Sequence, residues 1–146
     1  MRNASALTVV VVLLLTFLAV GTGETRAATY RVADTLPIDS VPSWFPVGFC
    51  LLTHGSQQYV VYYNDEHRMI VARRGLDERR WQKVALPSKV GWDSHNYITM
   101  AIDAAGCLHV SGNMHCVPLI YFRTVKPGDI TTFERLPMTG RDERRC

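Results

Sequence analysis

The sequence predicts an all-β protein, a partial β-propeller of about two four-stranded antiparallel blades that follow an N-terminal signal segment. Two observations carry this prediction. Short stretches with the residue content of β-strands alternate with turns every few residues, and no helical periodicity accompanies them. These stretches also fall into two groups of four, whose corresponding landmarks lie about 50 residues apart.

Residues 1–27 are predicted to be a signal peptide. Arg2 provides a basic start, and a cleavage site of small residues ends at Ala27. The apolar run Ala6–Val20 spans 15 residues, fewer than the roughly 20 that a membrane-spanning helix needs. We therefore expect a secreted or periplasmic protein without stable membrane insertion, in which residues 28–46 form an extended segment.

Charge and cysteine content narrow the class of protein. Removal of residues 1–27 leaves 146 − 27 = 119 residues, enough for one modest domain, and lowers the formal net charge from +3 to +2. So small a charge does not predict a nucleic-acid partner. The four cysteines, Cys50, Cys107, Cys116 and Cys146, allow three disulfide pairings, which stay open.

The first blade is predicted over residues 47–88. Its expected strands are rich in Val and Tyr or alternate apolar with polar residues, and turn residues such as Gly55 and Asn64 separate them. We expect the four strands at residues 47–53, 58–63, 68–73 and 81–86.

The second blade is predicted over residues 96–137, with strands at 97–102, 108–111, 119–123 and 132–136. The offsets between corresponding landmarks are 49 residues from Tyr59 to Leu108, 51 from Met69 to Ile120 and 52 from Trp81 to Phe133. A period near 50 residues that contains four strands is typical of a propeller blade.

Two blades do not close a ring, because β-propellers typically carry about 4–8 blades. We therefore expect residues 47–146 to be a truncated part of a larger propeller. A small two-sheet sandwich, complete in itself, is the alternative, and the repeat offset argues against it.

Two histidines stand at expected strand ends among small polar residues. His95 lies in the segment 91–97 and His115 in the segment 111–116, 115 − 95 = 20 residues apart. Because a rigid sheet positions the side chains at its strand ends, we expect neighbouring blades to aim both rings into a common cleft. His54 and His67 fall in turns and are expected to be solvated.

The segments 44–49, 86–97, 111–119 and 121–133 resemble BNR-type repeat proteins related to ulvan lyases. The resemblance covers residues 37–140, and the two histidine-bearing motifs are its specific part. It implies a seven-bladed β-propeller of several hundred residues, of which this chain corresponds to the N-terminal portion. It also implies that His95 and His115 line the substrate cleft, while a tyrosine and an arginine from later blades complete the site.

The lyases of this group cleave uronic-acid polysaccharides by β-elimination, in which a base removes a proton and a cation neutralises the neighbouring carboxylate. A histidine suits the first task because its ordinary pKa of about 6.5 leaves a neutral fraction near neutrality, and it suits the second when protonated. We assign the base or proton shuttle to His95 and carboxylate binding to His115. Substrate contacts are predicted for the neighbouring residues Asn96, Asn113, Trp92 and Tyr97.

A metal site competes with this interpretation. Cys107 with His109, and His115 with Cys116, could present soft ligands across a hairpin, but their spacing matches no common zinc finger or ribbon. We therefore expect no metal and no cofactor.

The sequence thus predicts an exported BNR-repeat protein that resembles polysaccharide lyases, takes an acidic polysaccharide as its partner, and is incomplete and inactive alone. A non-catalytic carbohydrate-binding or interaction module is the first alternative. A sialidase-like glycoside hydrolase is the second, and it lacks support because no arginine cluster lies beside the two histidine motifs.

Overall fold

The computed structural model describes residues 29–45, 48–113, 115 and 117–138. The chain divides into two compact units, Met1–Thr35 and Leu36–Cys146. The described part of the first unit, residues 29–35, contains no helix or strand, and all eight strands lie in the second unit. The predicted signal peptide lies outside the described residues, so export stays a prediction.

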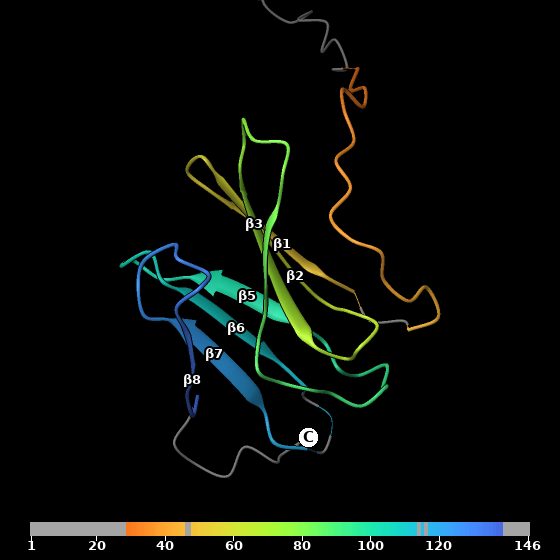
Figure 1. Cartoon of the computed structure of the whole chain (residues 1–146), viewed down its shortest axis with the longest axis vertical. Helices are drawn as coiled ribbons and strands as arrows, with labels where there is room; N and C mark the ends of the chain where they lie inside the picture. Colours follow the sequence, from red (N-terminus) through yellow and green to blue (C-terminus); the bar gives the residue numbers. More distant parts are fainter. Residues whose placement is uncertain (1–28, 46–47, 114, 116, 139–146) are drawn as a thin grey trace, which may run out of the picture. The chain divides into compact units, whose positions relative to one another are not determined.

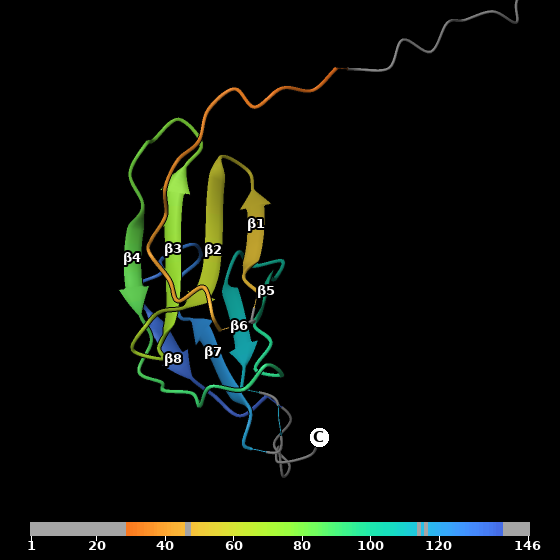
Figure 2. The same ribbon diagram turned by 90° about the vertical axis from the view of Figure 1, so that its right-hand side faces the viewer.

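The first sheet is an antiparallel meander whose strands pair in chain order (Figures 1 and 2). Its strands are β1 (Cys50–His54), β2 (Gln57–Tyr63), β3 (Met69–Gly75) and β4 (Gln82–Ala85). Gly55, at a φ of 56°, allows the two-residue turn between β1 and β2. After β2, the Asn64 side-chain oxygen accepts hydrogen bonds from the backbone N–H groups of Glu66 and Arg68 and closes the next turn.

The second sheet repeats this plan with β5 (Thr99–Ile102), β6 (Leu108–Gly112), β7 (Ile120–Thr124) and β8 (Phe133–Arg135). Asp103 closes the turn between β5 and β6, because its Oδ1 accepts the backbone N–H groups of Ala105 and Cys107, both at 2.9 Å. Gly106 occupies the left-handed region there, at a φ of 82°.

The predicted all-β class, with two four-stranded antiparallel sheets, is confirmed. All eight expected strands are present, and the largest displacement is at the first, expected over 47–53 and observed at Cys50–His54. The described residues contain no helix, and hence none with the length and apolarity to cross a membrane. That the sheets are blades of a closed propeller stays a prediction.

A single apolar core joins the two sheets. Alternate residues of β2 and β3 meet alternate residues of β6 and β7 in this core, which includes Val61, Met69, Val71, Leu108, Val110 and Phe122. The opposite face of the first sheet is also buried, in a cluster of Val60, Tyr62, Ile70 and Ala72 with Ile38 and Trp81 packed against it. In the described part of the chain, this second face is covered by residues from segments outside the strands, and not by another sheet.

The core prediction can be tested at Phe122, whose side chain is fully buried between the sheets. We expect Phe122→Ala to lower the free energy of unfolding by about 3–5 kcal/mol, because it removes apolar contacts and leaves a cavity. Phe49→Ala is the matched control, since Phe49 is 67% exposed, and we expect a change within about 0.5 kcal/mol. Urea titration followed by tryptophan fluorescence measures both; equal losses in the two variants would contradict this core.

Candidate functional site

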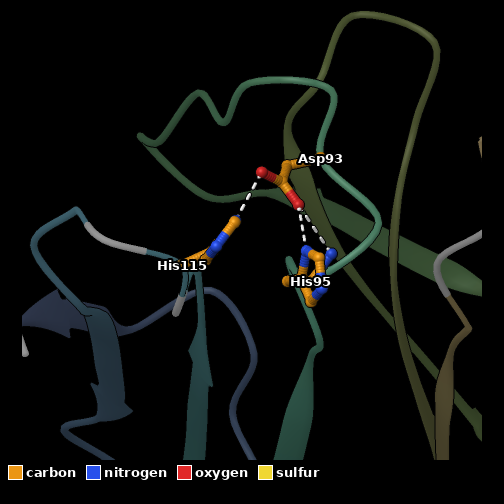
Figure 3. Close-up of side chains that lie close together, drawn as sticks. All are labelled: Asp93, His95 and His115. Carbon is orange, nitrogen blue, oxygen red and sulfur yellow. Dashed lines mark hydrogen bonds and ion pairs between the residues drawn. The ribbon is translucent and has the colours of Figure 1, made fainter. Parts of the chain in front are cut away.

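The candidate site lies at one end of the β5–β6 hairpin, where the loop before β5 meets the loop after β6 (Figure 3). His95 and His115 each lie four residues beyond the last pair of the ladder, Thr99 and Ser111, in the two loops that flank the hairpin. The structure brings the two rings together, but the expectation of neighbouring blades is wrong, because both histidines flank one hairpin of the second sheet.

The two imidazole rings face each other across the carboxylate of Asp93 (Figure 3). Their centroids lie 4.2 Å apart, at an interplanar angle of 46°. Asp93 Oδ1 lies 2.8 Å from His95 Nδ1, and Asp93 Oδ2 lies 2.6 Å from His115 Nδ1. Each carboxylate oxygen thus serves one ring, and the three side chains form one hydrogen-bonded group.

The carboxylate sets the protonation pattern of both rings. The backbone N–H of His95, followed by the side chains of His115 and His95, holds the pKa of Asp93 well below its usual range. An ionised carboxylate only accepts hydrogen bonds, so each ring donates from Nδ1. In the neutral imidazole, Nε2 then carries the lone pair and can take a proton or bind a cation.

Sequence reasoning missed Asp93. Its Oδ1 also accepts the backbone N–H of His95 at 2.8 Å, and its backbone carbonyl accepts the N–H of Asn96 at 3.1 Å. An aspartate two residues before a histidine, in a run of small polar residues, is typical of such a side-chain-closed turn. This local pattern could have predicted Asp93 as a site residue, because it places the carboxylate beside His95.

The other predicted site residues differ in their availability to a ligand. Asn96 is only 2% exposed and donates from Nδ2 to the Gly91 carbonyl at 2.7 Å, so it holds the loop in shape. Asn113 donates from Nδ2 to the Pro118 carbonyl at 3.3 Å. Tyr97 is 62% exposed. Contacts of any of these residues with a substrate stay predictions.

Trp92 belongs to an aromatic cluster beneath the loop. Its ring centroid lies 3.4 Å from that of His67, 4.3 Å from that of Phe45 and 4.4 Å from that of Trp44. His67 is half-buried and donates from Nδ1 to the Val90 carbonyl at 3.0 Å. The expectation of a solvated His67 is therefore wrong, because its ring packs against Trp92 and supports the loop that carries Asp93.

A close approach of the two sheets positions the loop of His115. A Cβ atom on Gly112 would collide with the side chains of Met69 and Tyr63 of the first sheet. Tyr63 Oη also accepts the backbone N–H of Asn113 at 3.2 Å. Asn113 adopts a φ of 59°, a left-handed conformation that asparagine tolerates, and turns the chain toward His115.

Among the described residues, Cys107 and His109 belong to no group of three potential metal ligands. His109 Nδ1 lies 2.7 Å from Tyr121 Oη, and His109 Nε2 lies 3.1 Å from Asp103 Oδ2. Cys50 and Cys107 are free, and Cys116 and Cys146 lie outside the described residues. A different group, Asp93 with His95 and His115, places three potential ligand atoms within 4.8 Å of one another.

The contact at Gly112 predicts a specific sensitivity. We expect Gly112→Ala to lower the free energy of unfolding by about 1–3 kcal/mol, because the added methyl group overpacks the junction between the sheets. Gly48→Ala is the matched control, since a Cβ atom at Gly48 meets nothing within 4 Å. Denaturant titration of both variants measures the difference; an unchanged Gly112→Ala protein would contradict the close approach.

Tyr63 predicts a dependence of stability on alkaline pH. Burial raises the pKa of Tyr63 to about 12, from an ordinary value of 10. The stabilisation is complete below pH 10 and is lost as the pH rises toward 12, because the unfolded chain releases the phenolic proton first. The loss amounts to roughly 2–3 kcal/mol over that range.

We expect Tyr63→Phe to flatten the fall in unfolding free energy between pH 10 and pH 12. Tyr97→Phe, at an exposed tyrosine, should keep the wild-type slope. Urea titrations at a series of alkaline pH values measure the slopes; a Tyr63→Phe slope equal to that of wild type would contradict the burial of this hydroxyl group.

Residues 57–146 match a family described as BNR repeat-containing family member. The matched region begins at the first residue of β2 and includes Asp93 and both histidines of the candidate site. No curated protein matches the chain. The match supports the predicted repeats, while a relationship to ulvan lyases stays a prediction.

Proposed function

Because the chain belongs to the BNR repeat-containing family, we propose that its histidine pair binds an acidic polysaccharide and transfers protons in β-elimination at a uronic-acid residue. One observation carries the proposal. The exposed imidazole of His95 and the half-buried imidazole of His115 lie 4.2 Å apart and share one ionised carboxylate, which leaves Nε2 of each ring available. The related proposals are export from the cell and kinship with polysaccharide lyases.

The elimination requires a base beside a cation. The base removes the proton next to the uronate carboxylate, the C–H electrons form a C=C bond, and the C–O bond to the leaving sugar breaks. A neutral imidazole, oriented through Nδ1 by a carboxylate, is a suitable base. A protonated imidazole beside the substrate carboxylate stabilises the negative charge that develops on it.

The geometry favours different roles for the two histidines. His95, at 61% side-chain exposure, is the more accessible ring and suits the base. His115 makes the shorter contact to Asp93, 2.6 Å, so its protonated form is compensated by a charge-assisted hydrogen bond. His115 therefore suits the binding of the uronate carboxylate as a cation.

The leaving oxygen also needs a proton, and we assign this step to none of the described residues. The resemblance places the completing tyrosine and arginine in later blades. Nearby, Tyr97 and Trp44 are 62% and 64% exposed, so their rings can stack on sugar units. These exposed aromatic rings also suit the alternative, a carbohydrate-binding module without chemistry.

The proposal is tested by incubating the purified chain, and a form extended by its genomic downstream sequence, with a uronic-acid polysaccharide. The ultraviolet absorbance of the unsaturated product is followed, and we expect it to rise for the extended form. Isothermal titration calorimetry measures binding of the same polysaccharide, with a neutral polysaccharide as the control ligand. We expect His95→Ala to lower product formation at least about 100-fold while binding persists, because loss of a general base has this effect. His115→Ala should weaken binding of the acidic polysaccharide itself.

His54→Ala is the matched control, since His54 is an exposed histidine at the end of β1, and it should behave as wild type. Binding without product in both forms would overturn the elimination and favour the binding module. Absence of binding to the acidic polysaccharide would overturn the proposed site as a whole.

A further inference from the structure

The same three side chains form a donor set for a metal ion. We propose that Asp93, His95 and His115 together bind one divalent transition-metal ion of the zinc, nickel or cobalt type. Each residue offers one ligand atom, and these atoms all lie within 4.8 Å of one another. The expectation of no metal weighed only pairs that contain a cysteine and did not include Asp93.

The chemistry of the donors selects the class of ion. Two imidazole nitrogens and one carboxylate oxygen suit zinc, copper, iron and nickel, and three protein ligands leave further coordination positions open. Magnesium and calcium take sets of oxygen ligands, so this site should reject them. The ionised carboxylate also supplies a negative charge that compensates part of the charge of the ion.

An ion bound by these three groups takes the place of the two Nδ1 protons, which are released to solvent, and requires only a small rearrangement. The two contacts that Asp93 makes with the imidazole nitrogens measure 2.6 and 2.8 Å. Ligand atoms on a tetrahedral zinc ion lie about 3.4 Å apart, given metal–ligand distances of about 2.0–2.2 Å. All three side chains are partly exposed, at 39%, 61% and 38% for Asp93, His95 and His115, so they can open by this amount.

The backbone that carries the ligands is held in place before any ion arrives. Hydrogen bonds within the turn fix Asp93 and His95 relative to each other. The bond between Tyr63 Oη and the Asn113 N–H fixes the start of the loop that carries His115. Ligands on two anchored loops need little ordering when they bind, which favours affinity.

Metal binding is independent of the proposed elimination, because it needs the three side chains and no sugar. It does compete with proton transfer, since the ion takes the imidazoles that would act as base and cation. The open coordination positions would themselves accept a carboxylate, so the metal-bound form is expected to bind an acidic ligand without cleaving it.

The test measures binding without polysaccharide. After treatment with a chelator and its removal, isothermal titration calorimetry with Zn²⁺ gives stoichiometry and affinity, and Co²⁺ reports coordination through its visible absorption. The variants are Asp93→Asn, His95→Ala and His115→Ala, with His54→Ala as the control at a histidine outside the site. Circular dichroism compares the folded state of each variant with that of wild type.

We expect one Zn²⁺ per chain, with no competition from Mg²⁺ or Ca²⁺. Each of the three site substitutions should weaken binding at least about tenfold, since loss of even an outer-shell partner has this effect, while His54→Ala binds as wild type. If His115→Ala is misfolded, the Zn²⁺ affinity of Asp93→Asn decides whether the site binds the ion, because asparagine keeps the shape of the aspartate side chain. Absence of Zn²⁺ binding in the wild-type protein would overturn the proposal. So would a Zn²⁺ affinity of folded Asp93→Asn and His95→Ala equal to that of wild type.

Discussion

The close contact of the two sheets at Gly112 is the constraint on which the site depends. No side chain separates the backbone there from Met69 and Tyr63, so the hydroxyl of Tyr63 reaches the N–H of Asn113. The apolar core on both sides of this contact holds it closed. The loop of His115 therefore begins at a point that the first sheet determines, although the loop belongs to the second sheet.

Asp93 orients the two imidazole rings that this backbone arrangement brings together. One carboxylate accepts a hydrogen bond from each imidazole and from the backbone of its own turn, so a single residue orients two rings. The resulting group offers two unprotonated Nε2 atoms in its neutral form, next to a compensating negative charge. The two proposals use different atoms of this group: proton transfer uses the Nε2 atoms, whereas an ion held by Asp93 and both rings takes the place of the Nδ1 protons. The two uses therefore exclude each other.

The strands and the histidine pair could be predicted from the sequence, because turn residues such as Gly55 and Asn64 and the alternation of apolar residues are local signals. The partner of the pair could not, because the meeting of Asp93 with His115 depends on the register of β5 and β6. The buried pattern specifies the register of the strands themselves, but beyond the last pair the meeting also depends on how the two flanking loops turn, which the strand pattern does not specify. The burial of Asn96 and the packing of His67 against Trp92 likewise depend on the loops, which composition does not encode.

The Asp93 carboxylate holds both rings in one tautomer, with the proton on Nδ1. Two-dimensional ¹⁵N NMR spectroscopy of the imidazole nitrogens, recorded on the metal-free protein where the histidines are neutral, measures this directly. We expect His95 and His115 both to carry their proton on Nδ1, and Asp93→Asn to shift the signals of both rings while those of His54 stay unchanged. Predominant Nε2 protonation of either ring, or spectra of both rings that are indifferent to Asp93→Asn, would contradict this arrangement.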